Sequence, residues 1–368
     1  MRVLHAPANV GNQPWVLSRR ERALGVQSDL IVNYTTWLGY PADHILSKHG
    51  QFGLGSLLRR TYHGIRAPLY YDVLHYYFGR TLLDWSDWSR CPGLPFADAR
   101  MAKRLGRKLF FTLQGCDARL AGESNRRNLH TMCRPDGCSA YGACISTIDN
   151  ARRKMIDVIS PLADRIFYLN PEIGHYARKG VFLPYANVDL DSVFPTGETS
   201  NARPLILHAP SDPTIKGTAL IEAALAQLRS QFEFDYVAVK GIPHAEAMAL
   251  YRKADLVIDQ VLAGWYGGFA VEVMAMGKPV AAYIREADLQ FLPTQMRRDL
   301  PVQNIHPDRL AMDLAGLLQR RAEWREIGAA SRRYVMTWHN PDKVAKAMIE
   351  AYRDPQAPFD LAAAVSGA

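Results

Sequence analysis

The stretch Pro204-Leu205-Ile206-Leu207-His208-Ala209-Pro210 decides the fold, because its Leu-His-Ala-Pro ending repeats that of Leu4-His5-Ala6-Pro7 near the N-terminus. Each of the two stretches is a short apolar run that leads into a polar loop and then into a helical pattern. The same alternation therefore starts twice in one chain. Two sheets in series, rather than one large sheet, are the simplest explanation.

Further short apolar runs, typical of buried strands, alternate with helical patterns in both halves. In the first half the expected strands are 2–6, 28–34, 71–76, 108–113, 165–169 and 181–184, with helices at 94–106 and 151–163. In the second half the expected strands are 204–210, 236–240, 256–258 and 280–283, with helices near 216–228, 244–254 and 269–276. Such alternation predicts parallel sheets covered on both faces. We expect an α/β fold of two Rossmann-like doubly wound lobes that face a cleft and bind a ligand there.

Composition agrees with this class and excludes others. The chain has 368 residues and a mass of 41.3 kDa, more than one hydrophobic core usually serves. With 48% hydrophobic and 22% charged residues it is neither disordered, collagenous nor a coiled coil. No apolar run approaches the roughly 18 residues of a membrane helix. The start of the chain is too polar for a secretory signal, so we expect a cytoplasmic protein.

The net charge of +8 is unevenly distributed. Residues 1–180 carry 25 Lys and Arg against 14 Asp and Glu, whereas residues 181–368 carry 19 against 22. A basic first half attracts polyanions, such as anionic lipid headgroups, nucleic acid or sugar phosphates. Because no nucleic-acid-binding motif accompanies the charge, we expect no nucleic-acid partner. The expected partner is an anionic membrane surface, contacted by Arg59, Arg60, Lys103, Arg104, Arg107 and Lys108; basic helices that merely solvate one lobe are the alternative.

Two stretches of the second half carry the strongest chemical signals. In Gly264–Val280 a Gly-rich loop leads into a helix, and the amides at such a helix start suit phosphate. Glu272, about one turn into that helix, can accept hydrogen bonds from ribose hydroxyls, or can merely complement the helix dipole. In Ser211–Thr218, Lys216 is a compact cation for a diphosphate, and Gly217 allows the backbone to approach it. A solvent-exposed Lys at a helix start is the alternative.

Together these stretches resemble the GT-B retaining glycosyltransferases of family 4. The matching positions are Gly267, Glu272, Ala275, Gly277, Pro279 and Val280, with Val273 where the family commonly has Ala. The resemblance implies that Glu272 binds the donor's ribose and that Lys216 neutralises its diphosphate. It implies transfer of a sugar, with retention of its anomeric configuration, from a nucleotide diphosphate to an acceptor hydroxyl of a glycan or a lipid-linked molecule. No catalytic metal and no protein nucleophile are expected, because the leaving diphosphate can accept the proton.

The resemblance also extends the candidate site and sets the expected domains. Lys216 and Asp117 are the candidate catalytic residues. The candidate donor-binding residues are Gly11, Asn12, Ser211, Asp212, Lys216, Gly217, Tyr266, Gly267, Gly268, Phe269 and Glu272. For Gly11 and Asn12 an ordinary turn is the alternative, and for Tyr266 simple core packing. The expected domains are an acceptor-side domain at 1–187 with a Cys-rich loop at 116–144, a linker at 188–203, a nucleotide-sugar-binding domain at 204–340, and a segment at 341–368 whose helix crosses back to the first domain.

Three positions depart from the family's pattern. Gly264 stands where the family has its first Glu, Ser211 where it has an Arg, and Gln114 where it has a His. Asp117 and Arg119 remain as polar groups on the acceptor side, or form a local pair that caps the next helix. The departures keep two alternatives open: a degenerate protein that binds a nucleotide or glycan without catalysis, and a nucleotide-sugar epimerase of the same fold.

Four of the five cysteines lie close together in the sequence. Cys116, Cys133, Cys138 and Cys144 fall in a polar segment that contains Gly and Pro, and four thiolates suit zinc or an iron–sulfur cluster. His130 could replace one ligand. We expect a structural zinc here, with the iron–sulfur cluster and metal-free reduced cysteines as alternatives.

Overall fold

The computed structural model describes residues 1–35, 39–47, 53–84, 93–197 and 201–366. The chain forms two compact units. Unit 1 consists of Met1–Arg119, Ala151–Asn187 and Pro341–Ala368, and unit 2 of Leu120–Asn150 and Val188–Asn340. The sequence prediction had placed the Cys-rich loop in the first domain, whereas most of it belongs to unit 2. Residues 198–200 of the predicted linker lie outside the described residues.

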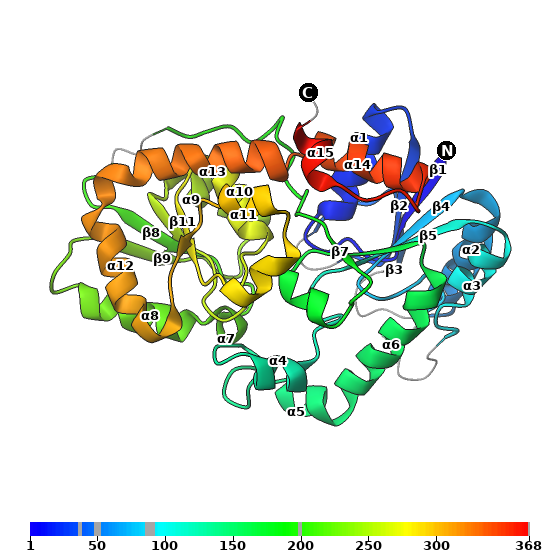
Figure 1. Ribbon diagram of the computed structural model, residues 1–368, viewed down its shortest axis with the longest axis horizontal. Coiled ribbons are helices and arrows are strands. Elements are labelled where there is room, and N and C mark those ends of the chain that lie inside the picture. The colour runs from blue at the N-terminus through cyan, green and yellow to red at the C-terminus, as the bar shows by residue number, and fades with distance from the viewer. Residues whose placement is uncertain (36–38, 48–52, 85–92, 198–200, 367–368) are drawn as a thin grey trace. The chain divides into compact units, whose positions relative to one another are not determined.

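Unit 1 contains a seven-stranded parallel sheet of order β3-β2-β1-β4-β5-β6-β7 (Figure 1). Its strands are β1 (Arg2–Ala6), β2 (Gln27–Tyr34), β3 (His44–Ser47), β4 (Val73–Tyr77), β5 (Lys108–Leu113), β6 (Arg165–Tyr168) and β7 (Val181–Phe182). Its helices are α1 (Gln13–Ala23), α2 (Leu54–Tyr70), α3 (Ala97–Arg104), η2 (Pro171–His175), α14 (Pro341–Arg353) and α15 (Leu361–Ser366), together with most of α6 (Asp149–Leu162). Helices α1 and α14 pack side by side.

The core of unit 1 explains why α14 belongs to it. Val344, Met348 and Tyr352 of α14 are buried among Val3 of β1 and Phe110 of β5. The Tyr352 hydroxyl also lies 2.7 Å from Nδ1 of the buried His75 on β4. The amphipathic pattern of α14 thus covers the first sheet, although the segment Val188–Asn340 of unit 2 directly precedes it in the chain.

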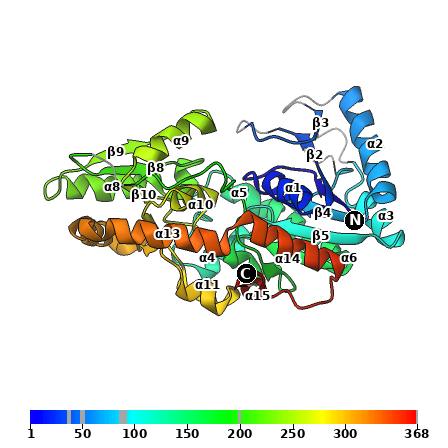
Figure 2. The same cartoon turned by 90° about the horizontal axis from the view of Figure 1, so that it is seen from above.

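Unit 2 contains a five-stranded parallel sheet of order β12-β11-β10-β8-β9. Its strands are β8 (Leu205–His208), β9 (Asp235–Ala238), β10 (Leu256–Ile258), β11 (Val280–Ala282) and β12 (Gln303–Asn304). Its helices are α4 (Ala121–Arg127), α5 (Tyr141–Ala143), η1 (Cys144–Ile148), α7 (Pro213–Lys216), α8 (Thr218–Leu228), α9 (His244–Lys253), α10 (Gly268–Ala275), η3 (Glu286–Phe291), α11 (Thr294–Arg298), η4 (Pro307–Arg309), α12 (Leu310–Gln319), η5 (Arg321–Glu323) and α13 (Trp324–Trp338). Helices α10 and α13 pack together in this unit (Figure 2).

Both sheets are doubly wound and parallel, as the sequence predicted. The strands of such a sheet are covered on both faces and are therefore apolar. In unit 2, for example, Ile206 and Leu207 of β8 and Ile258 of β10 are fully buried. No helix in the described part of the chain is long and apolar enough to cross a membrane.

Candidate nucleotide site in unit 2

The topology of the second sheet brings two loops together. Strands β8 and β10 are neighbours, while β9 lies on the far side of β8 and β11 on the far side of β10. The chain therefore leaves β8 and β10 in opposite directions, through residues 209–217 and 259–267. Ligands of open α/β sheets bind at such a switch point, beyond the carboxyl ends of the strands.

Lys216 and Asp259 meet at this switch point. Nζ of Lys216 lies 2.7 Å from Oδ1 of Asp259, and the two side chains are 11% and 0% exposed. The second carboxylate oxygen of Asp259 accepts a hydrogen bond of 2.6 Å from the amide of Gly267. One buried carboxylate thus fixes both the ammonium group and the residue before α10. The sequence analysis missed Asp259, although a carboxylate directly after a buried strand was a usable signal.

The start of α10 lies directly beside the ammonium group. A Cβ atom at Gly267 would be 3.2 Å from Nζ of Lys216, so only glycine leaves this space open. A helix start carries partial positive charge, and an ammonium group has three donors, of which Asp259 uses one. Together they provide the positive potential and the donors that a phosphate group requires.

Gly217 is required by its conformation and by its neighbours. Its φ is +76°, and an added Cβ would lie 2.5 Å from Cγ2 of Val261. The loop after β8 can therefore approach the loop after β10 only with glycine here. This close approach is what places Lys216 opposite Asp259.

Glu272 makes a contact that the sequence analysis missed. Its Oε1 lies 2.8 Å from Nε2 of His244, the first residue of α9. The hydrogen bond to Glu272 raises the pKa of His244 above its ordinary value, against the opposing effect of burial. His244 follows β9, the neighbour of β8, so its place at a helix start beside the same sheet was the available signal. The His244 ring holds the Glu272 carboxylate in one orientation.

The remaining predicted residues of unit 2 differ in their surroundings. Asp212 caps α7, where its Oδ1 accepts hydrogen bonds from the amides of Thr214 and Ile215 at 2.9 and 3.1 Å. Ser211 is exposed beside it. Gly268 and Phe269 form the first turn of α10, and the Phe269 ring packs edge-on against that of Tyr251. Asp212 therefore shapes the loop that carries Lys216.

For Tyr266 the structure corrects the prediction of a side chain packed near the donor. The Tyr266 side chain is 1% exposed, and its hydroxyl lies 3.0 Å from that of Tyr334 and 2.8 Å from Nε2 of His339. These partners belong to α13 and the residue after it. The side chain joins the Gly-rich loop to α13 and does not line an open site, which is the core-packing alternative.

The structure gives a physical reason for Gly264, which stands where the family has a Glu. Its φ is +73°, and an added Cβ would lie 2.6 Å from the guanidinium carbon of Arg285. Arg285 is itself held by Asp288, at 2.7 Å, and donates to the backbone oxygen of His130 at 2.9 Å. The volume that a longer side chain at position 264 would need is occupied by Arg285.

In unit 1, Gly11 and Asn12 follow β1 at the corresponding switch point, between β1 and β4, whereas Asp117 follows the next strand, β5. Gly11 and Asn12 both have φ of +63° and directly precede α1. The Asp117 carboxylate follows β5 and accepts hydrogen bonds from the amides of Gln114 and Gly115, at 3.0 and 2.6 Å. Burial raises the pKa of Asp117, while these amides act in the opposite direction.

The alternative of a local Asp117–Arg119 pair describes Arg119 only in part: burial raises the pKa of Asp117 and the charge of Arg119 opposes this, but the ion pair of Arg119 is with Glu172. Nε of Arg119 lies 2.8 Å from Oε2 of Glu172, and both side chains are buried. The Tyr176 hydroxyl donates to the other oxygen of Glu172. Arg119 is thus part of a buried ion pair with η2, and Asp117 caps its own turn.

The expected four-cysteine metal site does not form. Among the described residues, no group of three potential ligand atoms within 4.8 Å of one another contains a cysteine. Cys133 and Cys144 are buried in an apolar cluster with Met132 and Ala263, and Cys116 is exposed in unit 1. Cys138 is half-buried. Apolar packing of small side chains, rather than metal ligation, explains the two buried cysteines.

Comparison with known proteins shows the fold. No protein family and no curated protein matches the chain. Solved structures match over nearly its whole length: sucrose-phosphate synthase from Thermosynechococcus elongatus, at 16% identity and TM-score 0.62, covers 96% of this chain and 98% of its own. Starch synthase IV from Arabidopsis thaliana, solved with ADP and acarbose, has 13% identity, TM-score 0.57 and coverages of 96% and 99%. The UDP-GlcNAc 2-epimerase of Neisseria meningitidis, bound to UDP-GlcNAc, has 12% identity, TM-score 0.51 and coverages of 95% and 99%. The chain therefore has the GT-B fold, with two Rossmann-like units.

Proposed function

We propose that this protein is a retaining glycosyltransferase that moves a sugar from a nucleotide diphosphate to an acceptor hydroxyl. The observation that carries the proposal is the position of the Lys216 ammonium beside the start of α10, at the switch point of the second sheet. Similarity in fold to sugar-transferring synthases supports the same class of reaction. The acceptor is a hydroxyl of a glycan or a lipid-linked molecule in the cytoplasm, in the synthesis of glycans or cell-surface polysaccharides.

Each residue of the site has a role in this proposal. Lys216 and the first turn of α10 bind the diphosphate, and Glu272, oriented by His244, accepts hydrogen bonds from the ribose hydroxyls. The bond between the sugar's anomeric carbon and the phosphate oxygen breaks, and a bond to the acceptor oxygen forms. The acceptor's proton passes to the leaving diphosphate, whose growing negative charge Lys216 stabilises. In unit 1, Gly11 and Asn12 contribute backbone amides, and Asp117 shapes the acceptor loop.

A protein that binds a nucleotide sugar without transferring it is the second candidate. The observation that favours it is Gly264, since Arg285 occupies the space of the acidic side chain that contacts the donor sugar in the resembling family. An epimerase of the same fold is compatible with one of the structural neighbours, but it needs an acid and a base beside the sugar, and in the described part of unit 2 the titratable groups of the site are assigned here to the nucleotide.

The experiment that separates these functions is a panel of nucleotide sugars with two readouts. Calorimetry measures binding of each nucleoside diphosphate, and a coupled assay measures its release with and without acceptor glycans. Lys216→Ala and Glu272→Gln are expected to weaken binding roughly ten- to hundredfold, because each removes a hydrogen bond to a charged group. The exposed Lys253→Ala and Glu246→Gln on α9 are matched controls. Unchanged affinity in both site variants would contradict the proposal, and binding without release would favour the second candidate.

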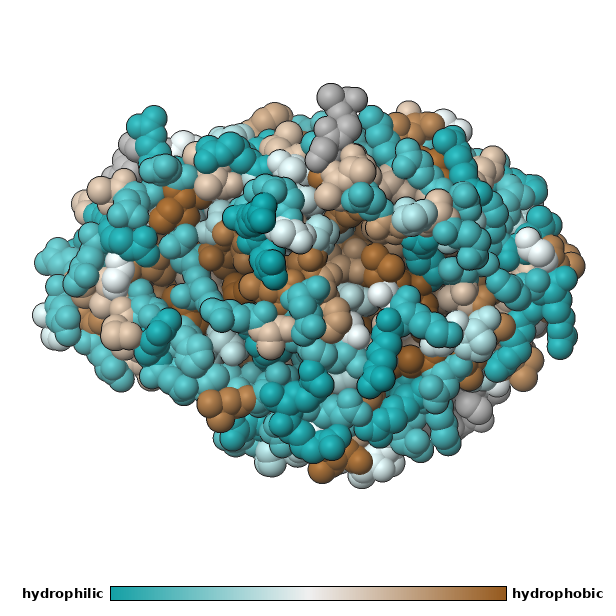
Figure 3. Space-filling view, in the orientation of Figure 1, coloured by the Kyte–Doolittle hydropathy of each residue, from teal (hydrophilic) through white to brown (hydrophobic). Residues whose placement is uncertain are grey.

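We also propose that unit 1 contacts an anionic membrane through α2. Five large apolar side chains lie exposed along this helix, at 49–72% exposure: Leu54, Leu58, Tyr62, Ile65 and Leu69. Their spacing of three or four residues places them on one face of the helix, and the helix contains no Asp or Glu. On the face in Figure 3, hydrophilic side chains predominate and hydrophobic ones form patches among them.

The basic residues beside this face differ from those predicted from sequence. Arg59 and Arg66 are exposed on α2 and flank the apolar stripe. Arg60 is fully buried, and Nζ of Lys108 donates to the backbone oxygens of Tyr352 and Arg353. The membrane contact therefore combines the α2 stripe with Arg59 and Arg66, and it does not include Arg60 or Lys108.

A further inference from the structure

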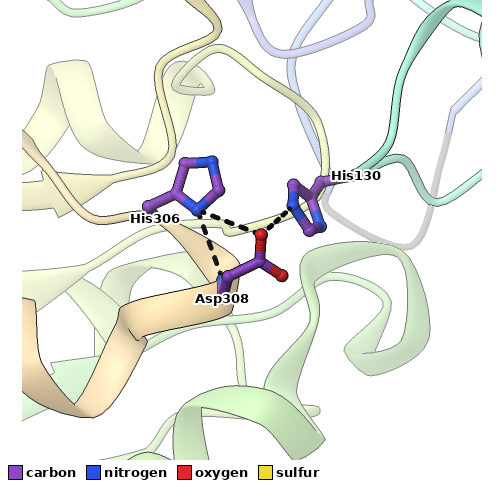
Figure 4. A group of neighbouring side chains, drawn as sticks. All are labelled: His130, His306 and Asp308. Atoms are coloured by element: carbon purple, nitrogen blue, oxygen red, sulfur yellow. Dashed lines mark hydrogen bonds and ion pairs between the residues drawn. The ribbon is translucent and has the colours of Figure 1, made fainter.

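Two histidines and an aspartate of unit 2 converge on one point (Figure 4). Nε2 of His130 lies 2.9 Å from Oδ2 of Asp308, and Nδ1 of His306 lies 3.7 Å from the same oxygen. The three ligand atoms all fall within 4.8 Å of one another. Among the described residues, this is the one group of three potential ligand atoms that lie so close together.

The group joins parts of the chain that are far apart in sequence. His306 and Asp308 flank Pro307 at the start of η4, just after the edge strand β12. His130 comes from the segment Leu120–Asn150, which belongs to the same unit. Arg285 donates to the backbone oxygen of His130 at 2.9 Å, and its own charge is compensated by Asp288. The backbone that carries His130 is thus fixed by a contact outside the group.

Ring packing fixes the two imidazoles. The rings of His130 and His306 have centroids 4.9 Å apart and are nearly perpendicular, and each also packs edge-on against Tyr283. Nδ1 of His306 accepts a hydrogen bond from the amide of Asp308, at a long 3.3 Å. A metal at this position would take the same lone pair of Nδ1, so it would replace this long hydrogen bond.

The distances fit a small tetrahedral cation. Ligand atoms at 2.0–2.1 Å from a tetrahedral metal lie about 3.3 Å from one another. Two of the separations, at 2.9 and 3.7 Å, bracket that value, and the third, between the two histidines, is within 4.8 Å. Two imidazoles and one carboxylate form a ligand set of the kind that zinc favours, whereas Mg²⁺ and Ca²⁺ prefer oxygen atoms alone.

The surroundings leave room for a metal and a fourth ligand. The nearest cation on the same turn, Arg309, is paired with Asp313 at 3.1 Å. A hollow of about 530 Å³, lined by Tyr283, Glu286, Asn304, His306 and Arg309 among others, adjoins the group. Water can therefore reach the fourth position of a tetrahedral site.

We propose that His130, His306 and Asp308 bind one zinc ion. The ion would join the segment Leu120–Asn150 to the edge of the second sheet, so its effect is to stabilise the fold of unit 2. The site is independent of the proposed sugar transfer, since it shares no residue with the proposed donor site. The proposed ligands differ from the four cysteines predicted from the sequence. His130, which the sequence analysis considered as a substitute ligand, is the one residue common to both.

Calorimetric titration of the chelator-treated full-length protein with zinc chloride tests the site. We expect one equivalent to bind to the wild type, and His130→Gln, His306→Gln and Asp308→Asn each to weaken binding more than about tenfold. His63→Gln, in unit 1, and Cys138→Ser are the controls, and both should bind zinc as the wild type does. Unaltered binding in the three site variants, or loss of binding in Cys138→Ser, would overturn the proposal.

X-ray absorption of the zinc-loaded protein gives a second test that does not depend on how well the variants fold. The proposal requires nitrogen and oxygen neighbours at about 2.0–2.1 Å, whereas thiolate ligation gives sulfur at about 2.3 Å. A sulfur shell, or the absence of any bound zinc in the wild type, would rule the site out.

Discussion

Asp259 shows how much of the site depends on one residue that sequence reasoning passed over. Lys216, Gly267 and Glu272 were predicted from the two stretches they belong to, because glycines, a cation and a carboxylate at helix starts have recognisable chemistry. Asp259 lies outside those stretches, and only the pairing of β8 with β10 brings it to Lys216. The sequence predicted that Tyr266 packs near the donor. It could not show that α13, far along the chain, supplies a hydrogen-bond partner for this side chain.

Replacing Asp259 by Asn should cost stability. The change removes a buried ion pair and weakens the bond to the Gly267 amide, so we expect the free energy of unfolding to fall by about 1.5–3 kcal/mol. Urea denaturation measures the difference, with Asp235→Asn, at an exposed position of β9, as the control. Equal losses in both variants would show that the buried pair has no special role.

The pair of His244 and Glu272 should be visible by titration. We expect the NMR-detected pKa of His244 to lie above 6.5 in the wild type and to fall in Glu272→Gln, because the hydrogen bond to the carboxylate is the main cause of the raised pKa. Because the pKa of His244 is raised in the folded state, protonation of His244 stabilises the fold. This contribution is fully present below the unfolded pKa of about 6.5 and is lost as pH rises through the folded pKa. Identical titration curves in the two proteins would contradict the assigned contact.

At the scale of elements, the sequence predicted most strands of both sheets but missed the edge strands β3 and β12, and it predicted the peripheral helices poorly. Strands β1 and β8, which lead into the two Leu-His-Ala-Pro endings, lie in parallel sheets whose strands are buried on both faces. An apolar run in the sequence therefore identifies each of these strands. Helix α2 was not predicted, because Gly64 and Pro68 are typical helix breakers. In the structure Gly64 packs where an added Cβ would lie 2.4 Å from Leu83, and Pro68 lies in the last turn. Tertiary packing, which the sequence does not display, overrides the local preference.

The exposed stripe of α2 should determine membrane affinity. We expect the full-length protein to co-sediment with phosphatidylglycerol vesicles at low salt and much less with phosphatidylcholine vesicles. Arg59→Gln should weaken this binding roughly fivefold, since a basic residue near an anionic surface contributes about 1 kcal/mol. Leu58→Gln should weaken it as well, with little change in the melting temperature.

Leu220→Gln is the matched control, because Leu220 is also exposed but lies on α8 of unit 2. Equal sedimentation with both kinds of vesicle, or equal effects of Leu58→Gln and Leu220→Gln, would argue against the α2 surface.

At the scale of the whole molecule, each unit contains a buried neutral histidine in its sheet. Burial lowers the pKa of His75 in unit 1 and of His208 in unit 2. His75 lies between the hydroxyls of Tyr352 and Thr112, each at 2.7 Å, and His208 lies between Thr218 and the backbone oxygen of Ile258. The imidazoles are therefore held in their neutral form in the folded protein.

Acid should destabilise both units through these histidines. Below pH of about 6.5 the unfolded chain binds a proton that the folded one does not, so the free energy of unfolding falls by up to about 1.4 kcal/mol per pH unit for each histidine. Unfolding in urea, followed above and below that pH, measures the slope. His75→Gln should flatten the slope for unit 1 alone and His208→Gln that for unit 2 alone. A slope unchanged by either variant would contradict the assignment.

The division of the chain has a consequence for how the protein is made. The polypeptide passes between the units four times, at residues 119–120, 150–151, 187–188 and 340–341. A ribosome that synthesises it from the N-terminus delivers the whole of the first sheet early, but the helix that covers Val3 and Phe110 only near the end. That apolar face stays uncovered by α14, exposed or bound by a chaperone, while the segment Val188–Asn340 of unit 2 is translated. Premature termination after residue 340 would therefore release a chain whose later-made unit can be complete while its earlier-made unit cannot.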